Sequence, residues 1–441
     1  MKILTIGGGA REHAAVEALA RAGAEIFAVM KNLNPGIEKR AKDVLLASED
    51  DIDRICDFAI NNYVEYAFVG PEAPLSSGVV DALARLGIKC ASPTKDAARI
   101  ETSKTFMRNL VDKYHIAGNL GYKSFDSADE AIAYVKTVPY KVAVKPVGLT
   151  GGKGVKVQGD QLTNIQETID YIQEIFDDNV GGGKVIIEEK AEGEEFTQMV
   201  FTNGTDVYPM PLVQDHKRAY EGDKGPNTGG MGSYSDANHL LPFITEDERA
   251  QAIEICKAII KALAAEGCPY HGPMYGQFML TKDGPKIIEI NARFGDPEAM
   301  NVLTTLLTDF SDVIKWMAGG KLKGGKVEFA NKATVCKYVV PRGYGVKSEA
   351  GHTISLDIEK IENSGAVAYF GSVDLRGGKL VTGTSRSIGI VGIGNDLAEA
   401  EQNCEAGLSY VKCDAIEIRH DIGKAELIQK RIDHMKQIRG Q

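Results

Sequence analysis

Over the first hundred residues, short apolar runs alternate with stretches of helical periodicity. The predicted strands are residues 2–6, 25–30, 66–69 and 88–90. Helices are predicted between them, at 13–21, 52–62 and 77–86. Strands that alternate with helices at this spacing form a parallel sheet with helices on both faces. The pattern therefore predicts an N-terminal parallel α/β domain at 1–101, with ligands at the carboxyl ends of its strands.

The central part of the chain mixes helical patterns with longer strands. Helices are predicted at 103–110, 162–176 and 245–266, and strands at 141–145, within 184–201, at 275–280 and at 286–290. The last two strands are close enough in sequence to form a hairpin. Residues 214–232 are polar and almost without periodicity, and such a long segment inside a compact domain is usually functional or disordered.

From about residue 326 onward, short apolar strands dominate. They are predicted at 334–340, 366–370, 386–391 and 415–420, with one helix at 396–411. This shift predicts a third, β-rich domain at 326–441, after a central region at 102–325. The fold class predicted for the whole chain is α/β with α+β parts.

The composition excludes several classes of protein but does not identify the function. The 441 residues carry 51 Lys and Arg against 61 Asp and Glu, a formal net charge of -10, so a global nucleic-acid-binding face is not expected. No apolar run reaches the ~18 residues of a membrane-spanning helix, so no membrane partner is expected. Seven widely spaced cysteines without a C-x-x-C pair exclude a disulfide framework and the usual zinc spacings, and favour a reducing, cytoplasmic location.

The first glycine cluster is a candidate phosphate loop. Gly7–Gly9 follows the first predicted strand, but Glu12 stands where the G-x-G-x-x-G dinucleotide fingerprint needs its third glycine. What remains is a helix N-terminus that can bind a phosphate, flanked by the cationic donors Arg11 and His13. The alternative is a tight strand–helix turn with surface charges.

A second glycine cluster, GLTGGKGV at 148–155, lacks the spacing of a Walker A loop. It is predicted to be a flap that closes over a triphosphate, with Lys153 inside the flap and Lys145 just before it. The alternative is a glycine-rich hairpin.

The segment IIEINARFGDPE at 287–298 carries the strongest chemical signal. Glu289 and Asn291 are two apart on a predicted strand, so their side-chain oxygens face the same side. Two such oxygens suit Mg²⁺, which completes its shell with phosphates and water. Ile288 and Ile290 are expected to point the other way, into the core.

Two further charged groups are candidates for substrate binding. Arg293 and Asp296 follow in a glycine-containing turn, where they can meet an anionic and a cationic substrate group. The run DHKR at 215–218 precedes KGPNTGGMG at 224–232, which is rich in backbone donors and favours an anion site. The alternatives are a surface salt bridge for the first group and a solvated charge run for the second.

Taken in order, these motifs resemble those of the glycinamide ribonucleotide synthetases, an ATP-grasp family of carboxylate–amine ligases in purine biosynthesis. The resemblance covers essentially the whole chain, although Pro146 and Val147 depart from the family's common Ala-Asp before the flap. It is carried by GGGAREHA (7–14), VGPEAPL (69–75), SKTF (103–106), GGKGV (151–155), QDHKR (214–218), GPNTGGMG (225–232), RFGDPE (293–298), TSRSIGIVGIG (384–394) and RHDIG (419–423).

The resemblance implies an ATP site in the central region, with a lid subdomain at about 120–191. Glu188 and the Lys190–Ala191 backbone would hold the adenine, Glu195 the ribose, and the lysines the phosphates. The residues that would bind ATP are Lys104, Lys145, Gly151, Gly152, Lys153, Gly154, Glu188, Lys190, Ala191 and Glu195.

It also implies a metal site and a pocket for 5-phosphoribosylamine and glycine. Glu289 and Asn291 would bind Mg²⁺ or Mn²⁺, with Gln277 on the neighbouring strand as a further ligand. Arg293, Asp215 and Asp296 would act catalytically, the two aspartates as candidates for amine recognition. The substrate pocket would comprise Gly9, Arg11, Glu12, His13, Glu72, Lys217, Asn227, Thr228, Gly229 and Gly230.

The implied reaction phosphorylates the glycine carboxylate with ATP, after which the amine of 5-phosphoribosylamine attacks the acyl phosphate. The implied partners are these small molecules alone, and the protein would be a monomer or weak dimer. Another purine-pathway ATP-grasp carboxylase or a formate-using enzyme is the first alternative. An NAD-binding oxidoreductase or a non-catalytic nucleotide sensor is the second.

Overall fold

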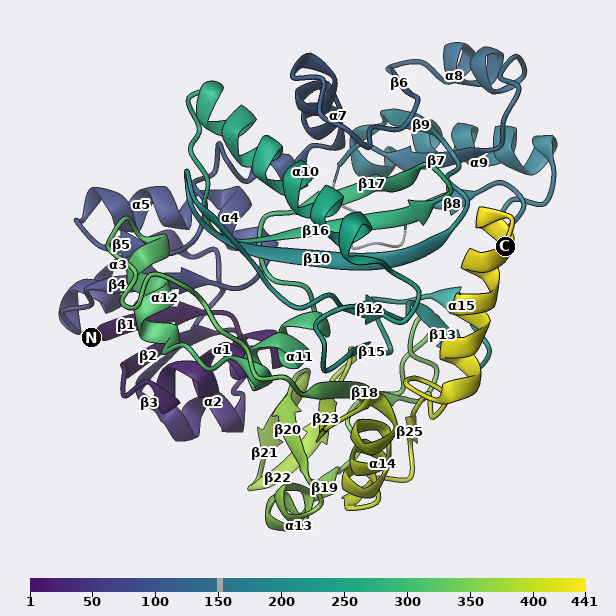
Figure 1. Cartoon of the computed structure of the whole chain (residues 1–441). Helices are drawn as coiled ribbons and strands as arrows, with labels where there is room; N and C mark the ends of the chain where they lie inside the picture. The colour runs from purple at the N-terminus through teal and green to yellow at the C-terminus, as the bar shows by residue number, and fades with distance from the viewer. Residues whose placement is uncertain (149–153) are drawn as a thin grey trace.

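The computed structural model describes residues 1–148 and 154–441. Four main sheets organise the chain: an N-terminal parallel sheet, a central sheet, a small sheet beside its upper end, and a C-terminal sheet below it (Figure 1). One continuous apolar core runs through the N-terminal, central and C-terminal sheets. The small sheet has an apolar core of its own.

The N-terminal unit has the parallel α/β architecture that the sequence predicts. Its strand order is β3-β2-β1-β4-β5, with all neighbours parallel. The strands are β1 (Lys2–Ile6), β2 (Glu25–Met30), β3 (Ala41–Leu46), β4 (Tyr66–Val69) and β5 (Lys89–Cys90). The helices are α1 (Ala10–Arg21), α2 (Pro35–Arg40), α3 (Ile52–Asn61), α4 (Glu72–Ser77) and α5 (Val79–Arg85). Strand β3 escapes prediction because, at the sheet edge, it buries none of its side chains and so lacks an apolar pattern.

The small sheet has the antiparallel order β6-β9-β7-β8. Its strands are β6 (Tyr122–Phe125), β7 (Val142–Pro146), β8 (Lys156–Val157) and β9 (Val185–Glu189). Helices α8 (Ala128–Val135) and α9 (Ile165–Asp177) pack on it and bury side chains such as Ala131 and Ile172. Because this core is separate from the main one, the small sheet is structurally a unit of its own.

The central sheet has the order β11-β10-β16-β17 and contains the predicted hairpin. Its strands are β10 (Glu194–Asn203), β11 (Val207–Pro209), β16 (His271–Thr281) and β17 (Gly284–Asn291). Helices α10 (Glu246–Ala265) and α12 (Phe310–Met317) pack on it, and α6 (Arg99–Thr102), α7 (Lys104–Lys113) and α11 (Glu298–Thr305) lie nearby.

A bulge in β17 changes which side chains face the cavity beneath the sheet. Gln277 pairs with Glu289 while the next residue, Phe278, pairs with Ile287, so Ile288 is the extra residue. Ile287 is buried in the core, whereas Ile288 is only partly buried and lines the cavity. The expectation that Ile288 points into the core is therefore wrong, because strict alternation fails at a bulge.

The C-terminal sheet draws on two distant parts of the chain, in the order β12-β15-β18-β23-β20, with β25 on the far end of β18. Its strands are β12 (Gln214–Asp215), β15 (Gly232–Ser235), β18 (Ala333–Pro341), β20 (Ala366–Phe370), β23 (Ile388–Gly394) and β25 (Ile416–Glu417), covered by α14 (Leu397–Leu408). The polar segment 214–232 is thus ordered, and it also contains the hairpin β13 (Arg218–Tyr220) and β14 (Lys224–Asn227). A Cβ atom at Gly232 would lie 2.2 Å from the carbonyl oxygen of Cys336, so this pairing requires glycine.

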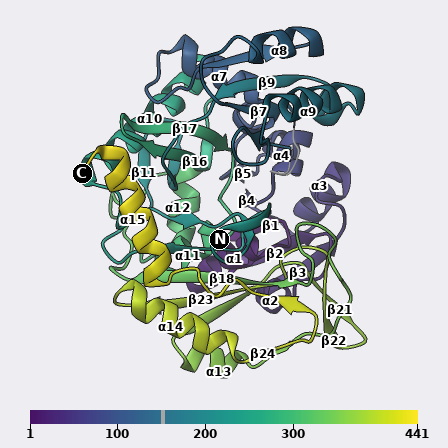
Figure 2. The same ribbon diagram turned by 90° about the vertical axis from the view of Figure 1, so that its right-hand side faces the viewer.

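The last helix, α15 (Ala425–Arg439), is not predicted by the sequence pattern. Only Leu427, Ile428 and Met435 are buried on it, which is too few apolar residues for a clear amphipathic signal. It runs from the C-terminal sheet up to the central sheet, where it contacts β10 (Figure 2).

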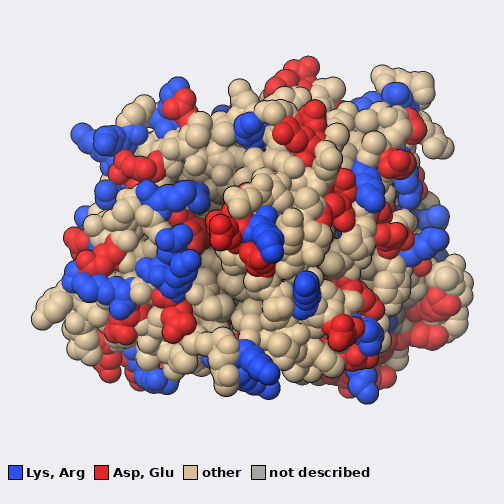
Figure 3. All heavy atoms as spheres, turned by 90° about the horizontal axis from the view of Figure 1, so that it is seen from below, with Lys and Arg blue, Asp and Glu red and all other residues tan. Residues whose placement is uncertain are grey.

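Basic and acidic side chains are interspersed over the face seen from below (Figure 3), as expected from 51 basic and 61 acidic residues. Among the described residues, no helix is long and apolar enough to cross a membrane.

Candidate active site

A cavity of about 1490 Å³ lies where the N-terminal, small and central sheets meet the segment 214–232. Pockets for one small ligand usually have roughly 300–1,000 Å³, so this cavity can hold more than one substrate. It brings together most of the predicted site residues: Gly9, Arg11, Glu12, Glu72, Lys104, Lys145, Glu188, Lys190, Ala191, Glu195, Asp215, Lys217, Asn227, Thr228, Gly229, Gln277, Glu289, Asn291, Arg293 and Asp296.

The other predicted residues do not line it or are not described. The structure contradicts the expectation that His13 supplies a cationic donor: its Nδ1 accepts the backbone N–H of Phe370 at 2.9 Å, and burial lowers its pKa. The cause is that strand β20 packs against α1. Gly154 accepts a hydrogen bond from the Tyr171 hydroxyl, and Gly230 packs against Pro297, both away from the cavity. Gly151, Gly152 and Lys153 lie outside the described residues.

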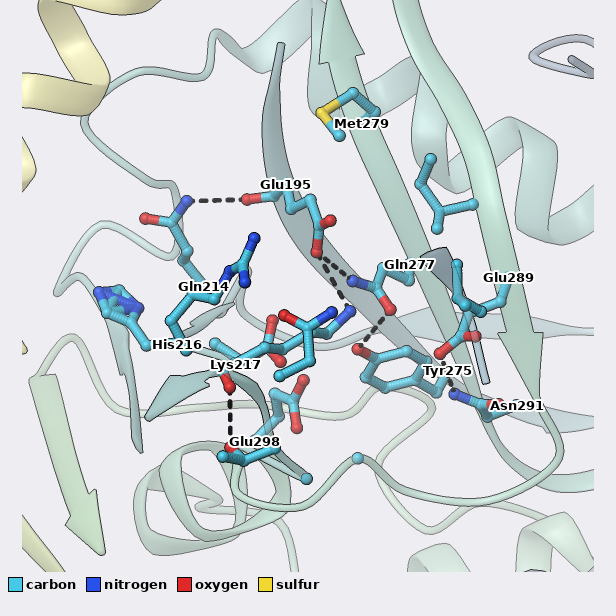
Figure 4. A pocket seen from close by; sticks show the side chains of 18 of the residues that line it. Glu195, Gln214, His216, Lys217, Tyr275, Gln277, Met279, Glu289, Asn291 and Glu298 are labelled. Carbon is cyan, nitrogen blue, oxygen red and sulfur yellow. Dashed lines mark hydrogen bonds and ion pairs between the residues drawn. The ribbon is translucent and has the colours of Figure 1, made fainter. Parts of the chain in front are cut away.

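Glu289 and Asn291 project from the same side of β17, as the sequence predicts (Figure 4). The Asn291 Nδ2 donates to Glu289 Oε1 at 3.3 Å. Burial opposes the charge on Glu289, but Lys217, Lys145, Asn291 and Lys104 together lower its pKa. The carboxylate is therefore ionised and surrounded by cationic groups, which also suit the phosphates of a nucleotide.

The metal-binding capacity of the site rests on oxygen atoms. Among the described residues, no group of three or more His, Cys, Asp and Glu side chains is arranged to hold a metal ion. A pair such as Glu289 and Asn291 fits Mg²⁺, which uses one or two protein ligands beside phosphates and water. The donor set therefore fits a hard divalent cation shared with a nucleotide.

Gln277 lies directly across from Glu289 on the neighbouring strand. Its Nε2 donates to Glu195, and its Oε1 accepts the Tyr275 hydroxyl at 3.4 Å. Lys217 Nζ lies 3.1 Å from Glu195 Oε2, so Glu195, Gln277 and Lys217 form one polar chain in the wall of the cavity (Figure 4).

A buried charge cluster lies at the end of the cavity next to the small sheet. Arg108 donates to both oxygens of Glu188 at 2.9 Å, and Lys145 Nζ lies 2.5 Å from Glu188 Oε2. Burial would raise the pKa of Glu188, but the two cations lower it to about 2. Both oxygens of Glu188 are thus engaged within the protein, and Lys145 is fixed with its ammonium at the cavity wall.

Lys104 is the second lysine at this end. It begins helix α7, and its Nζ donates to the carbonyl of Gly148 at 3.1 Å. Burial lowers the pKa of Lys104, and nearby Glu289 counteracts this.

The opposite end of the cavity is lined by two arginines, the buried Arg11 and the partly buried Arg293. Arg11 Nε lies 2.6 Å from Glu12 Oε1, and its Nη1 donates to the carbonyl of Phe294 at 3.1 Å. The other Glu12 oxygen accepts the N–H of Gly9 at 2.9 Å. Burial by itself would lower the pKa of Arg11, but the negative charge of Glu12 raises the pKa of Arg11 above its ordinary value.

Arg293 lies beside this group. Its Nη2 is 2.9 Å from Glu101 Oε1, and its Nε is 3.7 Å from Glu72 Oε2. Burial opposes ionisation of Glu72, but Arg293 and Arg11 lower its pKa, whereas burial raises the pKa of Glu101. Two cationic guanidiniums held by carboxylates are a suitable receptor for an anion.

Asp296 is held by residues from the C-terminal sheet. Arg386 Nη2 donates to Asp296 Oδ2 at 3.0 Å, and Tyr338 donates its hydroxyl to Oδ1. Arg386 Nη1 also donates to the carbonyls of Asp296 and Gly229, each at 2.6 Å. Arg386 thus joins the RFGDPE turn to the GPNTGGMG segment.

Asp215 is a cavity residue whose pKa is strongly raised. Burial raises its pKa to about 7, Lys217 counteracts this, and Glu298 and Glu195 raise it further. Burial also raises the pKa of Glu298, whose Oε1 accepts the Thr197 hydroxyl at 3.2 Å. A carboxyl group that titrates near neutrality can exchange a proton with an amine.

Sequence reasoning missed several residues that shape the cavity. Arg108 and Arg386 are remote from the motifs they organise, and Glu101 stands in a helix without a recognisable site pattern. The only signal was their place: Arg108 lies just after SKTF, and Arg386 inside TSRSIGIVGIG. The cavity-lining residues of α15 had no such signal in the sequence.

Comparison with solved structures shows the fold class. A crystal structure of phosphoribosylamine–glycine ligase from Thermotoga maritima superposes with a TM-score of 0.81 at 27% sequence identity, covering 96% of this chain and 100% of that one. A biotin carboxylase from Campylobacter jejuni shares the fold with a TM-score of 0.74 at 15% identity, covering 99% and 98% of the two chains. Together with a cavity between the small and central sheets, this likeness defines an ATP-grasp enzyme.

Sequence comparison identifies the family within that class. Models of the N domain, the ATP-grasp (A) domain and the C domain of phosphoribosylglycinamide synthetase match residues 1–101, 102–299 and 334–425. A phosphoribosylamine–glycine ligase from Methanobrevibacter smithii is 48% identical over 439 residues, 99% of this chain and 100% of that protein. The chain belongs to the phosphoribosylglycinamide synthetase family. It is an ATP-dependent carbon–nitrogen ligase, and enzymes of this class require a divalent metal ion.

Proposed function

We propose that this cavity joins glycine to 5-phosphoribosylamine, with cleavage of ATP to ADP and phosphate, to give glycinamide ribonucleotide. One observation carries the proposal: a single cavity connects a lysine-lined nucleotide end to an arginine-lined end at the N-terminal sheet. A triphosphate and a sugar phosphate both require cationic partners, and here they can bind side by side. The relative that is 48% identical over its full length carries the same activity in its name.

At the nucleotide end, Lys104 and Lys145 bind the ATP phosphates. The resemblance implies that Glu188 holds the adenine, but both of its oxygens are bound to Arg108 and Lys145, so in this proposal it acts on ATP through Lys145, whose ammonium lies 2.5 Å away. The Lys190–Ala191 backbone faces the adenine and Glu195 the ribose hydroxyls, since both line this end of the cavity.

Glu289 and Asn291 hold the metal, which we propose is Mg²⁺ or Mn²⁺, with Gln277 as a further ligand. Their partly buried oxygen donors beside three lysines support this role. When bound, such a cation offsets the negative charge that develops on the phosphoryl oxygens during transfer.

At the other end, Arg11 and Arg293 receive the phosphate of 5-phosphoribosylamine, with Gly9, Glu12 and Glu72 around it. Lys217 and the backbone of 227–229 complete the substrate pocket. Asp215 and Asp296 face the amino groups, because an ammonium pairs with a carboxylate. The pKa of Asp215, raised by burial to about 7, supports a role in proton exchange with an amine.

The chemistry needs no side-chain nucleophile. A carboxylate oxygen of glycine attacks the γ-phosphorus of ATP, the bond to the bridging oxygen breaks, and ADP leaves. The amine of 5-phosphoribosylamine then attacks the carbonyl carbon, loses a proton, and phosphate leaves with the acyl oxygen. The protein contributes position and cationic groups for the phosphoryl oxygens, and a closed cavity protects the acyl phosphate from water.

The experiment is ADP release with one acid at a time and 5-phosphoribosylamine generated in situ. We expect glycine to react, alanine to react poorly because a pocket built for a two-carbon amino acid excludes a larger one, and acetate and formate not to react because a carboxylate partner selects for the ammonium. Omission of 5-phosphoribosylamine is the control for uncoupled ATP hydrolysis. Comparable rates with formate and glycine would overturn the proposal in favour of a formate-using enzyme.

We further propose three domains, at 1–101, 102–325 and 326–441, with the lid at about 120–191. The separate apolar core of the small sheet supports the proposal that this segment is a lid subdomain. The seven free cysteines suit the reducing cytoplasm. Size-exclusion chromatography tests the proposed monomer or weak dimer.

A further inference from the structure

The C-terminal helix α15 forms one wall of the cavity, although it lies almost entirely beyond the matched C domain, which ends at residue 425. Residues on one side of the helix, among them Arg431, His434 and Gln437, line the cavity next to strand β10. The helix ends near the upper side of the central sheet (Figures 1 and 2). Its polar face is therefore part of the site rather than ordinary solvated surface.

Arg431 is the residue that connects α15 to two separate elements of the cavity. Its Nη2 donates to Asp223 Oδ2 at 2.5 Å, and its Nε lies 3.4 Å from Glu194 Oε2. His434, one turn further on, contacts the other oxygen of Glu194 at 2.5 Å. The guanidinium is mostly buried, so both contacts are made in a partly dry environment, where charge pairs are stronger than in water.

The two carboxylates belong to two elements that border the proposed nucleotide site and whose relative position sets its shape. Glu194 directly precedes Glu195, the residue assigned to the ribose, at the start of β10. Asp223 lies at the tip of the hairpin β13–β14, in a left-handed conformation with φ of 60°. The hairpin begins at Arg218, which pairs with Asp160 of the small-sheet unit, and ends at Asn227, which lines the cavity.

A second arginine holds the same hairpin from the C-terminal segment. Arg419 is 1% exposed; its Nη1 donates to the carbonyl of Arg218 at 3.0 Å and its Nη2 to Asp223 at 3.2 Å. Asp421 accepts the N–H of Gly222 at 2.8 Å. The hairpin is thus anchored independently of Arg431, so removal of Arg431 loosens the link to β10 without releasing the hairpin.

We propose that Arg431 is a positioning residue for ATP, which fixes the start of β10 and the tip of the hairpin relative to each other and so sets the ribose end of the cavity. The inference rests on the proposed function, because that function assigns Glu195 to the nucleotide. An arginine fits the task because its planar fork can reach two carboxylates at once.

The test compares Arg431→Ala with Arg439→Ala. Arg439 lies two turns further along α15, is similarly buried, and pairs with Glu248 of α10 away from the cavity. For Arg431→Ala we expect the KM for ATP to rise about tenfold or more, the loss expected from one charge-assisted contact, with kcat and the KM for glycine within about threefold. Arg439→Ala should leave all three parameters within about threefold of wild type.

Conservative variants separate positioning from simple loss of structure. Arg431→Lys should recover part of the KM for ATP, because one cation can still reach one carboxylate. If Arg431→Ala does not fold, Glu194→Gln, which keeps the volume, removes the carboxylate at the start of β10 and leaves the Arg419 anchor of the hairpin in place, should raise the KM for ATP in the same selective way.

Three results would overturn the inference. They are an unchanged KM for ATP in Arg431→Ala, or in Glu194→Gln where it takes its place; an equal rise in Arg439→Ala; and a fall in kcat without a change in KM. Wild-type enzyme that forms no ADP with glycine and 5-phosphoribosylamine would instead refute the proposed function.

Discussion

Replacing Arg386 by alanine is the most informative single change, because this residue joins two motifs that are about 90 positions or more away in the chain. Its guanidinium donates to Asp296 Oδ2 at 3.0 Å and to the carbonyls of Asp296 and Gly229 at 2.6 Å. Without it, the Asp296 carboxylate keeps the Tyr338 hydroxyl, and the Gly229 carbonyl loses the Arg386 donor, while the Gly229 N–H still donates to the Tyr344 hydroxyl at 3.3 Å. Both groups line or border the proposed glycine end of the cavity.

The size of the effect follows from these contacts. A hydrogen bond to a charged group contributes about 1.5–3 kcal/mol. The two carbonyls border the cavity and can bind water in the variant, so we count one to two contacts, about 3 kcal/mol. At 1.36 kcal/mol per factor of ten, kcat/KM for glycine should fall about 100-fold. The KM for ATP should stay within about threefold, because Arg386 does not touch the nucleotide end.

The assay is initial-rate ADP release with glycine varied at saturating ATP and 5-phosphoribosylamine, and then with ATP varied. Arg386→Lys should be intermediate, since an ammonium keeps the charge but not the fork. Arg376→Ala is the matched control, because Arg376 is an exposed arginine of the same C-terminal unit that pairs with Asp374. An equal loss in kcat/KM for ATP, or a change of less than about threefold for glycine, would refute this reasoning.

Three further outcomes are expected. Glu289→Ala should lower turnover at saturating Mg²⁺ to under about a tenth of wild type and weaken Mn²⁺ binding measured by electron paramagnetic resonance, because it removes the carboxylate ligand; unchanged Mn²⁺ binding would contradict the metal assignment. The pKa of Asp215 is raised to about 7, so the carboxylate forms as pH rises through that value, and kcat/KM for glycine should rise with it; a profile that Asp215→Asn leaves unaltered would argue against this. Glu188→Gln leaves the buried Arg108 and Lys145 without their counter-charge and should destabilise the protein by about 3–5 kcal/mol, seen as a lower Tm in thermal unfolding; a Tm equal to that of wild type would disprove it.

Periodic patterns predicted the parts of the fold whose burial is regular. The strands at 25–30, 66–69 and 366–370 have the predicted limits, because each alternates or runs apolar against a core. The edge strand β3 and the polar helix α15 lack such a pattern, since both are stabilised largely by what they dock against. Local sequence cannot reveal an element whose stability comes from a distant partner.

The sequence by itself determined which residues could serve as ligands and which short segments could hold them together. Glu289 and Asn291 share a face because a strand has a period of two, a property of the local backbone. Gly7–Gly9 and Gly229–Gly230 were likewise predicted as ligand-binding segments from their residue type alone.

Only the tertiary structure decided how these segments meet. It brought Arg386 to Asp296, Arg108 to Glu188, and Arg431 to both Glu194 and Asp223. It also turned Ile288 toward the cavity through a bulge and closed His13 off behind strand β20. The physical reason is that charge pairing, desolvation and register depend on distance in space, and residues this far apart in the chain come within ion-pair distance only when the sheets pack.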